Sequence, residues 1–127
     1  MKIYRCNTCG KILIVAKEGM GTTICCGKEM ERLTPKLEDH DLEEKHLPSI
    51  KCMCDKLCVK VGEVEHPHTP DHFIEWIAME TKSGYQLKYL KPEDEPKATF
   101  KFSKKCPPVA VYVYCNIHGL WKGTVSC

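Results

Sequence analysis

The chain has 127 residues, of which 28% are charged, and a formal net charge of +2 with acidic and basic residues interspersed. This pattern lacks the basic stripe that nucleic acid requires, and no apolar run approaches the roughly 18 residues that a membrane span needs. Ten cysteines, in contrast, are far more than an ordinary intracellular protein carries. In a reducing compartment, cysteines at this density indicate metal ligands first and disulfides second.

Residues 1–33 are expected to form a small separate unit. Short strands are predicted over residues 2–5, 12–16 and 23–25, with glycines between them. So few apolar residues cannot build a core, and a metal is therefore expected to hold this domain together. Because Cys6 comes before any apolar segment could form, we expect no signal peptide and a cytoplasmic location.

Residues 34–44 are polar and acidic, which predicts a linker with at most one helical turn. From there to residue 127 we expect a second domain made of strands. The predicted strands cover residues 57–64, 73–79, 85–90, 98–102, 109–114 and 121–125. Short strands at this spacing favour an all-β class and an antiparallel sandwich of about seven strands. The period of two places Cys115 on the same, inner face as Val111 and Val113.

Four cysteines form the first candidate metal site. Cys6 and Cys9, two residues apart and followed by Gly10, make a metal-binding knuckle, and Cys25 and Cys26 supply two further thiolates. Four thiolates suit a tetrahedral zinc or a single iron. An adjacent pair is unusual and should strain the tetrahedron. A structural zinc, a one-iron redox centre and a disulfide between Cys25 and Cys26 are three interpretations that stay open here.

Histidines and one cysteine form the second candidate metal site. Five of the six histidines fall in three loop segments at strand ends, one of which begins at a cysteine. These candidate ligands are His46, His66, His68, His72, His118 and Cys115. A single thiolate with several imidazoles suits iron, copper or zinc. The residue types do not choose between His68 and His72.

The motifs together resemble those of the desulfoferrodoxin family over nearly the whole chain. They are Cys6-x-x-Cys9 with Cys25-Cys26, Glu44-Lys45-His46-Leu47-Pro48, His66-Pro67 followed by His72, and Cys115-Asn116-Ile117-His118-Gly119-Leu120-Trp121. The resemblance implies a desulforedoxin-like domain over residues 1–36 and an immunoglobulin-like sandwich over residues 37–127. It also implies two mononuclear irons. The first is held by Cys6, Cys9, Cys25 and Cys26, and the second, catalytic iron by His46, His66, His72, His118 and Cys115.

The same resemblance implies a superoxide reductase that protects an anaerobe from oxidative stress. Superoxide would be reduced to hydrogen peroxide with one electron and two protons, and no dioxygen would form. Lys45 would attract and stabilise the anion, and Glu44 would bind the oxidised iron. A rubredoxin is the implied electron donor and a homodimer the implied assembly. A plain electron carrier and a zinc-containing binding module are the competing hypotheses.

Five cysteines belong to none of these motifs: Cys52, Cys54, Cys58, Cys106 and Cys127. Cys52, Cys54 and Cys58 together could bind a further soft metal. The favoured interpretation is that all five are free thiols, which could pair when the purified protein meets air.

Overall fold

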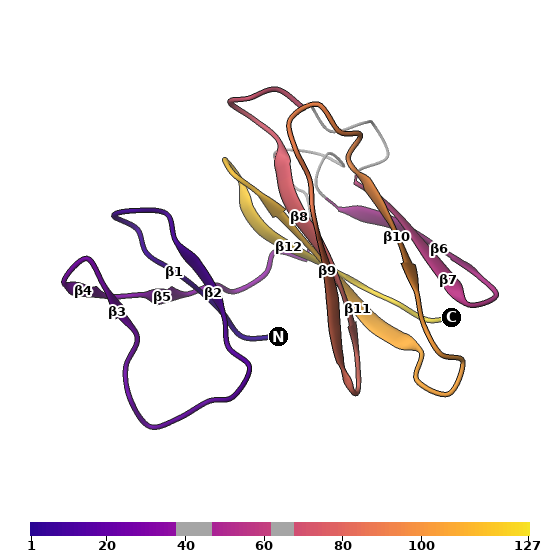
Figure 1. Cartoon of the computed structure of the whole chain (residues 1–127), viewed down its shortest axis with the longest axis horizontal. Helices are drawn as coiled ribbons and strands as arrows, with labels where there is room; N and C mark the ends of the chain where they lie inside the picture. Colours follow the sequence, from indigo (N-terminus) through magenta and orange to yellow (C-terminus); the bar gives the residue numbers. More distant parts are fainter. Residues whose placement is uncertain (38–46, 62–67) are drawn as a thin grey trace. The chain divides into compact units, whose positions relative to one another are not determined.

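A computed structural model describes residues 1–37, 47–61 and 68–127 of the chain (Figure 1). It divides into two compact units, Met1–Thr34 and Pro35–Cys127. In the described residues all regular structure is β, and no helix is long and apolar enough to cross a membrane.

The first unit is built from five very short strands. A three-stranded sheet has the order β2-β1-β5, and a separate hairpin pairs β3 with β4. The strands are β1 (Ile3–Arg5), β2 (Ile12–Ile14), β3 (Ile24–Cys25), β4 (Lys28–Glu29) and β5 (Glu31–Arg32). Ile3, Cys6 and Met30 are the buried hydrophobic residues of this unit. Three side chains make a very small core, so the unit needs another source of stability.

The second unit is a sandwich of seven antiparallel strands in two sheets (Figure 1). One sheet has the order β10-β7-β6, with β6 (Pro48–Met53), β7 (Lys56–Val61) and β10 (Lys97–Lys101). The other has the order β12-β11-β8-β9, with β8 (Ile74–Thr81), β9 (Gly84–Tyr89), β11 (Pro108–Cys115) and β12 (Gly119–Thr124). The first, second and fifth strands thus face the third, fourth, sixth and seventh, which is an immunoglobulin-like arrangement. The predicted all-β class and seven-stranded sandwich are confirmed.

The core lies between the two sheets, as strand alternation predicts. Inward side chains of β7, β8, β10 and β11 fill it; they include Leu57, Val59, Val61, Ile77, Met79, Phe100, Val111, Val113 and Cys115. Cys115 shares the inner face with Val111 and Val113, as expected, and Cys115 is 0% exposed. Burial of this apolar surface holds the end of β11 rigidly, which fixes the Cys115 backbone at the rim of the sandwich.

Two pairings were not among the predicted elements. β6 is a strand with alternating half-buried and exposed side chains, and it begins at Pro48, a position that an edge strand tolerates. Lys36 forms a parallel bridge with Trp121 of β12, so part of the predicted linker is sheet. The helical turn considered for residues 34–44 falls mostly outside the described residues.

Cys52 and Cys127 form a disulfide with a Cα–Cα distance of 5.8 Å. Cys52 lies in β6 and Cys127 follows β12, so the bond joins edge strands of the two sheets. The prediction of free thiols is therefore wrong for these two residues, and it holds for Cys54, Cys58 and Cys106. A soft-metal site shared by Cys52, Cys54 and Cys58 is also excluded in this state, because a disulfide sulfur has no thiolate to offer.

Candidate metal centres

The structure brings the four N-terminal cysteines into one cluster. One potential ligand atom from each of Cys6, Cys9, Cys25 and Cys26 lies within 4.8 Å of all the others. The Sγ atoms of Cys9 and Cys25 are 3.6 Å apart, and those of Cys25 and Cys26 are 3.9 Å apart. Four sulfurs at a metal–sulfur distance of about 2.3 Å form a tetrahedron with edges of about 3.8 Å (2.3 × 1.63). These two distances match that edge, and all the sulfurs lie within 4.8 Å of one another, so the cluster is close to the size of a tetrahedral metal site.

Backbone geometry explains how two adjacent cysteines can point to one centre. Cys26 has φ of +54° and the following Gly27 has φ of +75°. A non-glycine residue in this left-handed region costs about 1 kcal/mol or more, so the conformation persists only where something compensates. In the other pair of cysteines, the N–H of Cys9 donates to the Cys6 sulfur at 3.5 Å, as in a metal-binding knuckle. The strained feature that the structure shows at the adjacent pair is the left-handed backbone of Cys26.

The pKa values indicate that a cation favours ionisation of all four thiols near neutral pH. The N–H of Cys9 lowers the pKa of Cys6 to about 6. Hydrogen bonds with Cys9 and Cys6 raise the pKa of Cys25 to about 12, and hydrogen bonds with the same two residues, Cys9 foremost, raise the pKa of Cys26 although Cys25 lowers it in part. One thiolate therefore forms easily and opposes ionisation of the next thiol. A bound metal ion would instead favour ionisation of all the thiols that bind it. The donor set and its spacing fit zinc or iron.

Replacing Cys9 by serine is expected to remove the metal of this cluster and to leave the metal of the second cluster in place. The two clusters share no ligand and belong to separate units. Metal analysis of the purified variant, with absorption spectra to distinguish the sites, measures this. Loss of both metals together would contradict two independent sites, and a Cys54→Ser variant, which alters an exposed thiol outside both clusters, is the control.

The second cluster joins His72, Cys115 and His118, whose ligand atoms all lie within 4.8 Å of one another. Cys115 ends β11, and His118 lies in the turn that leads into β12, while His72 precedes β8. The Cys115 Sγ is 4.0 Å from Nδ1 of His118, and the rings of His72 and His118 have centroids 5.0 Å apart. One thiolate and two imidazoles so placed fit a metal of the iron, copper or zinc type.

The Cys115 thiol is suited to a metal rather than to solvent. Burial raises its pKa, and backbone N–H groups of His118 and Ile117 oppose that effect only in part. In water-excluded surroundings the thiolate needs a cation, and the two N–H groups would then tune its electron density. Lys36, which lies outside the turn in sequence, contacts it directly. Its Nζ donates to the His118 carbonyl at 2.9 Å and lies 4.9 Å from the Trp121 ring centroid. No local pattern in the sequence pointed to Lys36.

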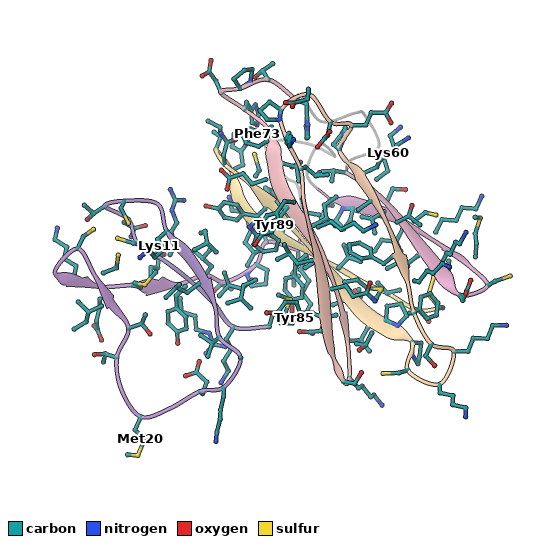
Figure 2. The ribbon with its side chains drawn as sticks, in the orientation of Figure 1. Lys11, Met20, Lys60, Phe73, Tyr85 and Tyr89 are labelled. Carbon is teal, nitrogen blue, oxygen red and sulfur yellow. A yellow bond between two sulfur atoms is a disulfide. The ribbon has the colours of Figure 1, made fainter. Side chains whose placement is uncertain are left out.

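The structure also separates His72 from His68. Nε2 of His68 accepts the N–H of Ile74 at 3.2 Å, so this nitrogen is engaged with the backbone. His72, in contrast, pairs through its backbone with Thr69, and its ring lies against that of His118. Figure 2 shows the neighbouring Phe73 at the start of β8, at the same end of the sandwich as Lys60. Glu44, Lys45, His46 and His66 lie outside the described residues.

Comparison with known proteins identifies the family. The family model described as desulfoferrodoxin matches residues 38–124, and the model of the desulfoferrodoxin N-terminal domain matches residues 1–33. The chain belongs to the desulfoferrodoxin family. A desulfoferrodoxin homolog of Archaeoglobus fulgidus is 43% identical over 122 residues, which are 96% of this chain and 95% of that relative.

Several proteins similar to this desulfoferrodoxin-family chain carry the name of an enzyme. A superoxide reductase of Pyrococcus abyssi is 35% identical over 109 residues, covering 65% of this chain and 87% of the relative. The crystal structure of the superoxide reductase from Treponema pallidum is similar over 97% of both chains, with a TM-score of 0.82 and 27% identity. The similarity therefore extends through both units of the chain.

Proposed function

We propose that this desulfoferrodoxin-family protein is a superoxide reductase, an oxidoreductase that converts superoxide to hydrogen peroxide. The observation that carries the proposal is the cluster of His72, Cys115 and His118 at the rim of the sandwich. Solved and curated superoxide reductases are similar to the chain across this region. In each turnover, one superoxide anion takes up one electron and two protons and gives one hydrogen peroxide.

The catalytic site in this proposal holds a mononuclear iron between four histidines and one cysteine. The ligands would be His46, His66, His72, His118 and Cys115. Iron bound there would supply the electron that superoxide takes up. The buried Cys115 thiolate would donate electron density, and the N–H groups of Ile117 and His118 would limit that donation.

Two charged residues have proposed roles in this site, Lys45 toward the substrate and Glu44 in the oxidised state. Lys45 would raise the local concentration of the superoxide anion and stabilise it once bound. The Glu44 carboxylate would bind the iron in its oxidised state, after peroxide has left. Its role would thus follow the reaction rather than assist the first step.

The first cluster is proposed to hold a second mononuclear iron in the Cys6, Cys9, Cys25 and Cys26 tetrahedron. Its spacing supports a four-thiolate centre. We further propose that a rubredoxin supplies the electrons, that two copies form a homodimer, and that the protein works in the cytoplasm of an anaerobe. The small core of the first unit supports assembly through a partner.

The direct test is the stoichiometry of the reaction. Reduced protein mixed with a known amount of superoxide should yield one hydrogen peroxide for each superoxide consumed, without dioxygen. A dismutase would yield half as much peroxide together with dioxygen. A protein whose two centres can be reduced, but which gives no peroxide above the yield of uncatalysed dismutation, would be an electron carrier instead.

Lys45→Ala is expected to slow the second-order reaction with superoxide by about tenfold or more and to weaken its dependence on salt, because a cation beside the entrance attracts the anion. Glu44→Ala should leave this step nearly unchanged and alter the spectrum of the oxidised protein. Pulse radiolysis at two salt concentrations measures both. Lys56→Ala, at the exposed start of β7, is the matched charge control. An unchanged rate for Lys45→Ala would remove its electrostatic role, and a slowed first step for Glu44→Ala would place the carboxylate earlier.

A further inference from the structure

The side chain of Asn116 connects the two segments that carry the second cluster. Its Oδ1 accepts the N–H of Phe73 at 3.0 Å, and its Nδ2 donates to the carbonyl of Asp71 at 2.9 Å. These two residues are the immediate neighbours of His72 on either side. Asn116 itself follows Cys115 directly and lies two residues before His118. The Asn116 side-chain amide therefore bonds to both neighbours of the candidate ligand His72, and it belongs to the turn that carries the other two candidates.

We propose that Asn116 is a positioning residue that sets the place of His72 relative to Cys115 and His118. The proposal rests on the second metal site of the proposed function, and it assigns a role to a residue that is not itself a ligand. Outer residues of this kind commonly matter for metal affinity, because they fix the orientation of the ligands.

The sheet alone does not hold His72 in place. From Ala110 to Tyr114, β11 pairs regularly with β8, and the register then shifts, so that Cys115 faces Ile74. Beyond that irregularity, the N–H of Asn116 still donates to the Phe73 carbonyl at 3.2 Å, and no strand continues to His72. The Asn116 side chain offers a donor and an acceptor as a peptide group does, and it extends the pairing past the end of β8.

A further restraint on His72 is local to its own loop. The backbone N–H of His72 donates to the Thr69 carbonyl at 3.1 Å, and the N–H of Thr69 donates back to the His72 carbonyl at 3.0 Å. These bonds shape the loop without tying it to β11. In the described part of the chain, the two bonds of the Asn116 side chain and the bond of its backbone N–H join the His72 loop to the Cys115–His118 turn.

The chemistry of the amide makes the proposal specific. Alanine at position 116 would remove both side-chain bonds. Aspartate would keep an acceptor for the N–H of Phe73 but would place a carboxylate against the Asp71 carbonyl, where a donor is needed. Asn116→Ala should therefore weaken metal binding by about 10- to 100-fold, the range usual for such outer residues, and Asn116→Asp should also weaken it.

The experiment measures Co²⁺ affinity of the full chain by competition with a chelator, following the thiolate-to-cobalt absorption. Every protein, including the reference, carries Cys9→Ser and Cys26→Ser, so that the second cluster dominates the signal. Asn116→Ala, Asn116→Asp, His72→Ala and the Asn116→Ala/His72→Ala pair are compared. Gln86→Ala is the matched control, because the Gln86 side-chain amide donates to the Lys101 carbonyl at 2.6 Å elsewhere in the sandwich.

If Asn116 acts through His72, Asn116→Ala should lose about tenfold or more in affinity, yet change it less than about twofold once His72 is already alanine. Gln86→Ala should leave affinity unchanged. Equal losses in both backgrounds would overturn the positioning role, as would unchanged affinity in Asn116→Ala. Should the alanine variant fail to fold, unchanged affinity in Asn116→Asp would overturn it equally. If His72→Ala itself had no effect, the metal site of the proposed function would be wrong instead.

Discussion

His72→Ala is expected to lose the metal of the second site, proposed to be iron, and the reduction of superoxide, whereas His68→Ala should keep both. His72 has its ring beside that of His118 and belongs to the cluster with Cys115. His68 uses Nε2 to accept a backbone N–H, which engages that nitrogen away from a metal. Removing a direct ligand should lower metal affinity by more than the 10- to 100-fold typical of outer residues.

Iron content and the thiolate-to-iron absorption of the two purified variants give the measurement. His68→Ala should show only a stability loss of about 1 kcal/mol, because one hydrogen bond to Ile74 disappears. Each variant thus serves as the control for the other, since both remove an imidazole from the same loop. Full iron in His72→Ala together with depleted iron in His68→Ala would show that the ligand assignment is reversed.

The sandwich was predictable because its strands follow a local rule. Alternation in β11 puts Val111, Val113 and Cys115 on one face, and the structure buries all three in the core. β6 also alternates, yet its inward positions are Pro48, Ile50 and Cys52, of which only Ile50 is a strong strand former. The alternation typical of a strand is therefore present in β6, but its residue types are not those that usually identify a strand.

The metal clusters were predictable to the extent that their ligands are close in sequence. The Cys6–Cys9 knuckle and the Cys115–His118 turn each hold two candidates within four residues, so the backbone alone brings them together. The residue types left His68 and His72 both open, and the family resemblance implied His72. The hydrogen bond from Ile74 to His68, which depends on how β8 begins, supports the same assignment. That information is tertiary, and residue types could not supply it.

Long-range pairings had no signal in the sequence. Lys36 pairs with β12 through backbone groups, which every residue possesses, so nothing in its identity announced the bridge. Cys52 and Cys127 are 75 residues apart, and ten cysteines allow many pairings. Only the approach of β6 to β12 selects this pair. Gly123 marks that approach, because a Cβ added to it would lie 2.6 Å from Cγ of Pro48.

The disulfide leads to a large expected effect on stability. Cys127→Ser should lower the free energy of unfolding of the sandwich by about 4 kcal/mol, because opening a loop of this length returns conformational entropy to the unfolded chain. Cys52→Ser should cost a similar amount, and the double variant should cost no more than either single one, since all three remove the same bond. Reductant should lower the stability of the unaltered chain toward that of the variants.

Denaturant unfolding followed by tryptophan fluorescence suits this measurement, because both tryptophans, Trp76 and Trp121, lie in the second unit. Cys54→Ser is the matched control: it changes an exposed thiol two residues from Cys52 and should shift stability by no more than about 0.5 kcal/mol. Equal stability of the unaltered chain with and without reductant would show that the bond does not hold the two sheets together. Additive losses in the double variant would mean that each cysteine stabilises the sandwich by packing, independently of their bond.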